Sequence, residues 1–88
     1  MTKEEISAKN MVLGFEFDKY LIEHPEAIEE IPDDGVVVLL PDEDKELVEE
    51  NLKMADKYKL EGKKVVYVRV KKMSPYPKSR FLDVSLSR

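Results

Sequence analysis

Five consecutive apolar residues, Val36 to Leu40, are the feature that most restricts the fold of this chain. Gly35 precedes the run and Pro41 follows it, so the segment is short and has sharp ends. No polar residue alternates with the apolar ones. This pattern favours a strand that is covered on both faces, as the strands of parallel sheets are.

The following segment supplies the connection that parallel strands require. Asp44 is the predicted N-cap of a helix that reaches Leu60, and Gly62 is placed to end that helix. Residues 64–72 then predict a second strand. Together these segments form a strand–helix–strand unit, for which a right-handed crossover is expected. The apolar stripe expected on the inner side of this helix consists of Leu47, Val48, Leu52 and Ala55.

Two shorter elements complete the predicted fold. Pro25 begins a helical turn that is expected to direct Ile28 and Ile31 inward. Residues 81–87 alternate apolar and polar side chains, which predicts a half-exposed strand. We therefore expect one α/β (or α+β) domain over residues 1–88. An N-terminal helix and a short helical turn precede a β-α-β unit and a C-terminal strand, and helices cover a three-stranded mixed sheet whose central strand is 36–40.

The N-terminal segment predicts a helix over residues 3–23 with apolar side chains on two sides. Thr2 is the expected N-cap, and Glu5 stands where a capping box needs it. One layer of sheet cannot cover two apolar faces in so short a chain, so we expect part of this helix to contact a second copy of the protein. The residues expected at that homo-oligomer interface are Met11, Phe15, Phe17, Tyr20 and Ile22.

Composition narrows the class of protein further. The 88 residues include no cysteine, which excludes disulfides, zinc fingers, iron–sulfur ligation and thiol catalysis. A small domain without disulfides or structural metals depends for its stability on packing, ion pairs or oligomerisation. The chain also lacks Gln and Trp and has many charged residues, a composition that is typical of thermophile proteins. No apolar stretch is long enough to span a membrane, and the acidic start of the chain is unlike a signal peptide, so a cytoplasmic location is expected.

Enzymatic chemistry finds little support in the sequence. The single histidine, His24, precedes Pro25 at the end of a predicted helix, where a structural role is the expected one. The acidic groups at 33–34 and 42–44 flank one strand and would lie roughly 26 Å apart, too far to share an ion. Helix capping accounts for the second group. No catalytic residue, metal site or cofactor is therefore expected.

The charge is unevenly distributed along the chain. Residues 1–60 carry 7 basic and 17 acidic side chains, whereas residues 61–88 carry 8 and 2. The basic part also contains aromatic side chains, a combination used by proteins that bind single-stranded nucleic acid. The alternative is that these cations pair with acids of the same chain or protect a sheet edge. Residues that would bind nucleic acid or another acidic partner are Tyr67, Arg69, Lys71, Lys72, Tyr76, Lys78 and Arg80.

Three segments carry a resemblance to a known family. They are residues 17–26 (FDKYLIEHPE), residues 35–44 (GVVVLLPDED) and residues 65–71 (VVYVRVK). In these segments the chain resembles a small family of uncharacterised proteins from hyperthermophilic archaea and some bacteria. The resemblance implies a fold and a thermophilic source, and it carries over no catalytic residue.

Overall fold

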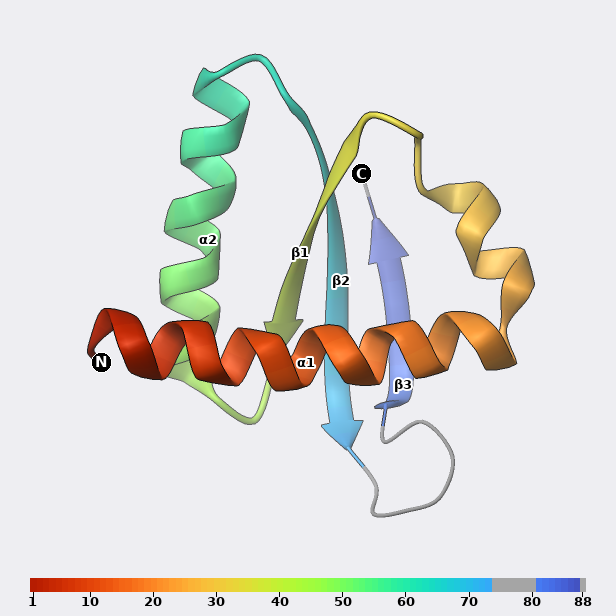
Figure 1. Ribbon diagram of the computed structural model, residues 1–88, viewed down its shortest axis with the longest axis horizontal. Helices are drawn as coiled ribbons and strands as arrows, with labels where there is room; N and C mark the ends of the chain where they lie inside the picture. Colours follow the sequence, from red (N-terminus) through yellow and green to blue (C-terminus); the bar gives the residue numbers. More distant parts are fainter. Residues whose placement is uncertain (74–80, 88) are drawn as a thin grey trace.

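Three strands form one mixed sheet, with a helix packed on each of its faces (Figure 1). The computed structural model describes residues 1–73 and 81–87. Its elements are α1 (Lys3–Glu23), the 3-10 helix η1 (Pro25–Glu30), β1 (Gly35–Pro41), α2 (Lys45–Leu60), β2 (Lys64–Met73) and β3 (Phe81–Ser87). The predicted fold class is confirmed, because an N-terminal helix and turn precede the β-α-β unit and the last strand.

The strand order β1-β2-β3 places β2 at the centre of the sheet. β1 pairs with β2 in parallel, from Gly35 opposite Lys64 to Pro41 opposite Val70. β3 pairs with β2 in antiparallel fashion and therefore takes its other edge. The prediction that 36–40 is the central strand is wrong. Two consecutive antiparallel strands joined by a short connection pair with each other, and this leaves β1 at the far edge of the sheet.

α1 crosses the strands on one face of the sheet (Figure 1). Leu13 and Phe17 of this helix are buried against side chains of β2 and β3, among them Val68 and Phe81. The ring centroids of Phe17 and Phe81 lie 6.3 Å apart. This apolar cluster holds α1 to the sheet and fixes which side of the helix faces away from it.

α2 packs on the opposite face, along the edge formed by β1. Ala55 of this helix is fully buried in a second cluster with Val38, Leu40 and Val65. The neighbouring β1 residues Val37 and Leu39 point to the other side and pack against the first cluster. Both faces of β1 are therefore covered, as the unbroken apolar run predicted.

The helix boundaries follow from local signals in the sequence. The Thr2 side chain accepts a hydrogen bond from the Glu5 N–H, and the Glu5 carboxylate accepts one from the Thr2 N–H, so the predicted capping box is present. Asp44 caps α2 by accepting a hydrogen bond from the Leu47 N–H at 3.2 Å. Gly62, just beyond α2, has a φ of +81°, a conformation that L side chains rarely adopt. No helix among the described residues is long and apolar enough to cross a membrane.

Ile28 and Leu52, which were predicted to point inward, instead lie at the surface. Ile28 is exposed, and Ala27 is the buried residue of η1. Ile31 does pack against the core, but it follows η1 in an extended conformation, so helical spacing from Ile28 does not set its direction. Leu52 is also exposed, and its neighbour Asn51 occupies the interior. At 100° per residue Asn51 lies between Leu47 and Ala55, whereas Leu52 lies at the margin of the stripe.

Candidate functional site

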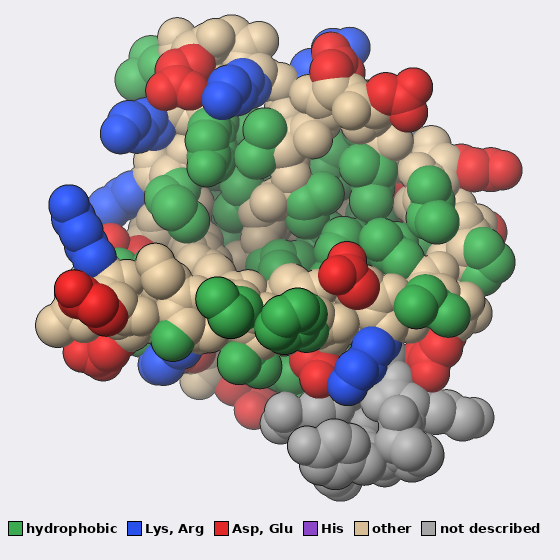
Figure 2. All heavy atoms as spheres, viewed as in Figure 1, with side chains coloured by type: hydrophobic (Ala, Val, Ile, Leu, Met, Phe, Trp, Pro, Cys, Tyr) green, Lys and Arg blue, Asp and Glu red, His purple; other side chains and the backbone are tan. Residues whose placement is uncertain are grey.

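The side of α1 that faces away from the sheet carries a row of large apolar side chains. Met11 and Phe15 are each 62% exposed, Val12 is 49% exposed, and Ile22 is 80% exposed. Met11, Phe15 and Ile22 lie within about 40° of one another around the helix, opposite the buried Leu13. Figure 2 shows hydrophobic side chains following α1 along the front of the molecule. We call Met11, Val12, Phe15 and Ile22 the outer face of α1.

Two of the five residues predicted for a homo-oligomer interface pack against their own chain instead. Phe17 is 6% exposed and packs in the core of its own chain. Tyr20 is half-buried, and its ring stacks on His24 with centroids 4.3 Å apart. Burial and the nearby carboxylates of Glu26 and Glu30 raise the pKa of Tyr20. The helical spacing explains the outcome, because Phe17 and Tyr20 lie on the Leu13 side of α1.

A hollow of about 450 Å³ adjoins the outer face of α1. It lies between α1, β1 and α2, and Figure 2 shows it above α1 with hydrophobic side chains around it. Among the described residues that line it, Asp18 is the one that carries a charge. The lining consists of Asn10, Met11, Gly14, Phe15, Phe17, Asp18, residues 36–39, Asn51, Met54 and Tyr58.

Gly14 lies where the outer face of α1 meets this hollow. A glycine within a helix costs about 1 kcal/mol relative to alanine. Its φ is not in the left-handed region, and a Cβ built at this position would meet no atom of the chain within 4 Å, its own helix backbone aside. Neither backbone conformation nor crowding within this chain therefore requires glycine here.

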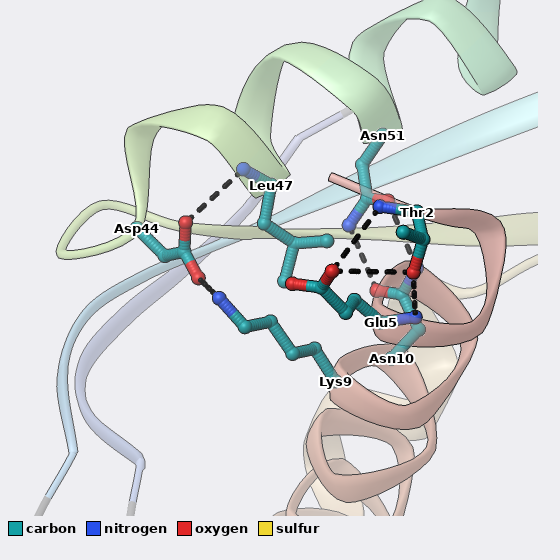
Figure 3. Close-up of polar contacts among 7 residues, drawn as sticks. All are labelled: Thr2, Glu5, Lys9, Asn10, Asp44, Leu47 and Asn51. Atoms are coloured by element: carbon teal, nitrogen blue, oxygen red, sulfur yellow. Dashed lines mark hydrogen bonds and ion pairs between the residues drawn. The ribbon is translucent and has the colours of Figure 1, made fainter.

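The wall of the hollow is held by two asparagines, the only two in the chain. Their side-chain amides form reciprocal hydrogen bonds of 3.0 and 2.9 Å, and the Asn51 amide also donates to the Leu39 carbonyl of β1 at 2.7 Å (Figure 3). Asn51 is 1% exposed. The pair of Asn10 and Asn51 therefore joins α1, α2 and the outer edge of β1 at one point. Sequence reasoning missed this pair, although Asn51 stands four residues from both Leu47 and Ala55, a signal that could have revealed it.

A second link between the helices lies nearby, where the Lys9 ammonium donates to the Asp44 carboxylate at 2.6 Å (Figure 3). This hydrogen bond raises the pKa of Lys9. The same bond, together with the one from the Leu47 N–H, lowers the pKa of Asp44. Asp44 therefore caps α2 and holds the first turns of α1 beside it.

Of the three described basic residues predicted to bind nucleic acid, two lie beside acids of the same chain. Arg69 donates to Asp42 at 3.0 Å, and the Lys71 ammonium lies 3.7 Å from the Asp83 carboxylate. Lys59 lies over the Tyr67 ring at 4.9 Å, and Tyr67 raises the pKa of Lys59. Lys72 is exposed on β2. The other three predicted residues, Tyr76, Lys78 and Arg80, lie outside the described residues.

His24, Asp34, Asp42 and Asp44 each lie beside a partner in their own chain. The His24 Nδ1 lies 3.1 Å from the Tyr20 carbonyl at the end of α1. Asp34 lies 3.6 Å from Lys64, and Asp42 and Asp44 have the partners given above. Within residues 1–73 and 81–87, no three His, Asp or Glu side chains are grouped so that they could hold a metal ion.

A family model described as a family of unknown function (DUF5647) matches residues 5–82, which extend from the first turn of α1 to the start of β3. No curated protein and no solved structure matches the chain.

Proposed function

The chain belongs to the family of unknown function DUF5647, and we propose that it is a non-catalytic interaction domain that forms homodimers through the outer face of α1. The observation that carries this proposal is the exposure of Met11, Phe15 and Ile22 on one side of a helix whose other side is buried in the core. Large apolar side chains exposed together on one surface are typical of protein–protein interfaces.

The non-catalytic part of the proposal rests on how the reactive side chains are used. His24 stacks on Tyr20 at the end of α1. Asp44 is occupied by a helix cap and an ion pair, and Asp42 accepts a hydrogen bond from Arg69. Each of these groups has a structural role within its own subunit.

The test is the mass of the protein in solution. We expect light scattering at high micromolar concentration to give twice the monomer mass of 10.2 kDa. Phe15→Glu would place a carboxylate in the interface and return the protein to a monomer with an unchanged circular dichroism spectrum. Ile22→Glu is a second variant, because Ile22 is more exposed than Phe15 and contributes less to its own subunit.

The matched control is Leu60→Glu, at the end of α2. Leu60 is 90% exposed and lies outside the outer face of α1, so the same change of charge and hydropathy should leave the dimer intact. A wild-type protein that stays monomeric at these concentrations would refute the proposal. Equal loss of the dimer in Phe15→Glu and Leu60→Glu would also refute the role of α1.

An acidic partner, such as single-stranded nucleic acid, is the alternative. It is supported by the alternation that directs Tyr67, Arg69 and Lys71 to one side of β2. It is opposed by the ion pairs of Arg69 with Asp42 and of Lys71 with Asp83. A fluorescence titration with single-stranded RNA and DNA separates the two proposals, because binding through phosphate contacts would weaken steeply as salt is added.

We also propose a cytoplasmic location and a thermophilic source, in line with the family resemblance. Support comes from a chain without cysteine, Gln or Trp and from ion pairs that join separate elements, such as Lys9 with Asp44. A thermal melt tests the source. A Tm above about 90 °C is expected of a hyperthermophile protein, and one in the mesophile range would contradict it.

A further inference from the structure

A cavity of about 500 Å³ lies at the carboxyl ends of the two parallel strands, beside the first half of α1. Pro41, the last residue of β1, pairs with Val70, so residues 71–73 of β2 extend beyond the end of β1. β1 and β2 run towards the same edge of the sheet (Figure 1). In open α/β sheets, ligands bind outside the carboxyl ends of the strands. The cavity therefore has both the position and the volume of a small-molecule site.

The floor of the cavity is apolar and belongs to the core. Leu13, Leu47 and Val70 are buried in one cluster, and each of them also lines the cavity. Val12 and Met73 add apolar surface at the sides. Because core packing holds this surface in place, an apolar ligand would displace water from a preformed site.

The remaining side chains of the lining are charged, and among the described residues they sum to one positive charge. They are Lys9, Lys71, Lys72, Glu43 and Asp44. The three lysines are exposed, so their ammonium groups can reach a ligand at the opening of the cavity. A net positive opening above an apolar floor favours a ligand with an apolar body and a negative group.

The lysines keep hydrogen-bond donors available for such a group. The Lys9 ammonium donates to Asp44 across the opening (Figure 3), and an ammonium has three N–H donors. Lys71 lies 3.7 Å from Asp83, and because both side chains are more than half exposed this pair is weak. Within residues 1–73 and 81–87, no carboxylate lies within 4 Å of the Lys72 ammonium. Lys72 is therefore the first candidate to bind an anion.

The lining disfavours two other common classes of ligand. None of the described residues around the cavity is aromatic, so a nucleobase would find no ring on which to stack. Hydroxyl and amide side chains, which can both donate to and accept from a sugar hydroxyl, are also missing from this described lining. An aliphatic chain that ends in a carboxylate matches the groups that are present.

We infer that this cavity binds a small aliphatic carboxylate, with its chain against Leu13, Leu47 and Val70 and its carboxylate at the lysine ammonium groups, Lys72 above all. Glu43 lies exposed at the same opening and repels the ligand. The inference goes beyond the proposed homodimer and does not depend on it, because Phe15 and Ile22 do not line the cavity.

The experiment titrates the full chain with octanoate and follows the backbone amides by NMR. We expect a dissociation constant of about 1 mM or lower. Amide signals of Leu13 and Val70 should shift, whereas those of Val38 and Tyr58, which line the hollow beside Gly14, should not. Octan-1-ol has the same chain without the charge and should bind roughly 10-fold more weakly. Acetate lacks the chain and should give no shifts over the same concentrations.

Two substitutions at the opening should act in opposite directions. Lys72→Glu should raise the dissociation constant for octanoate roughly 10-fold or more, because it replaces a donor with a like charge. Glu43→Gln should lower the constant, because it removes the opposing carboxylate. Lys57→Glu is the matched control: it makes the same change of charge at an exposed position of α2 outside the lining, and it should leave the constant unchanged.

The outcomes separate this inference from the homodimer. No shifts at the cavity with octanoate up to about 10 mM would overturn the inference and leave the homodimer standing. Equal binding of octanoate and octan-1-ol, or equal effects of Lys72→Glu and Lys57→Glu, would also overturn it. The Phe15→Glu variant keeps every residue of the cavity lining and should bind octanoate as the wild type does, so a failure of the homodimer proposal would leave this inference intact.

Discussion

Replacing Asn51 with alanine tests whether the buried amide pair holds the two helices to the sheet. The substitution removes three hydrogen bonds, two with Asn10 and one with the Leu39 carbonyl. Each contributes about 1 kcal/mol net to the free energy of unfolding. The part-buried Leu39 carbonyl left without its partner adds about 1 kcal/mol, and half-buried Asn10 can bond to water.

We therefore expect Asn51→Ala to lower the free energy of unfolding by about 4 kcal/mol, measured by urea denaturation. This is a large part of the 5–15 kcal/mol typical of a folded domain, and it corresponds to a fall in Tm of roughly 15–30 °C. Asn10→Ala should cost somewhat less, about 3 kcal/mol, because it removes two hydrogen bonds and leaves the buried Asn51 amide oxygen without a partner, whereas Asn51 keeps its bond to the Leu39 carbonyl.

The double variant isolates the contact itself. If the two amides bond to each other as the structure shows, the summed costs of the single substitutions should exceed the cost of the double by about 2–3 kcal/mol. Additive costs would refute the reciprocal pair. A cost below about 1 kcal/mol for Asn51→Ala would show that water replaces its bonds, and the link between α2 and the β1 edge would then be unimportant.

Three further predictions concern the ends and the inner side of α2. Asp44→Ala should cost about 1 kcal/mol through the lost N-cap. Because the pKa of Asp44 is lowered in the folded state, its contribution should be present above its unfolded-state pKa and lost as the pH falls through the lower folded-state value. Asp44→Asn should flatten that part of the stability–pH curve, and an unaltered curve would contradict this. Gly62→Ala should cost about 1 kcal/mol in urea unfolding, since alanine is strained at a φ of +81°, and an unchanged midpoint would speak against a requirement for glycine. Leu47→Ala should cost about 2–5 kcal/mol and Leu52→Ala much less, because the first side chain is buried and the second exposed; equal costs would contradict the observed orientation of α2.

The predicted extents of the helices and strands agree closely with the structure because their ends depend on neighbouring residues. The capping box of Thr2 and Glu5 starts α1, Asp44 starts α2, and Gly62 follows its end. The alternation over 81–87 likewise gives the bounds of β3. Each of these signals acts over a few residues, so it can be read without knowing what lies across the molecule.

The candidate site was only partly predictable. The two apolar sides of α1 are visible in the sequence, but helical spacing alone does not say which side the sheet covers. The sheet covers the side of Phe17, which left Met11, Phe15 and Ile22 at the surface. The hollow beside Gly14 could not be predicted at all, because its lining comes from three elements that are distant in the sequence.

The sequence by itself determined the elements of this protein, their order and the mixed α/β architecture. Capping, turn formation and hydrophobic periodicity are local effects, because each depends on residues that are close together in the sequence. Only the tertiary structure decided that β2 is central, that Asn51 replaces Leu52 in the interior, and that an apolar helix face adjoins an apolar hollow. These features depend on which surfaces meet when the elements pack, and packing joins residues according to shape and burial, not their distance along the chain.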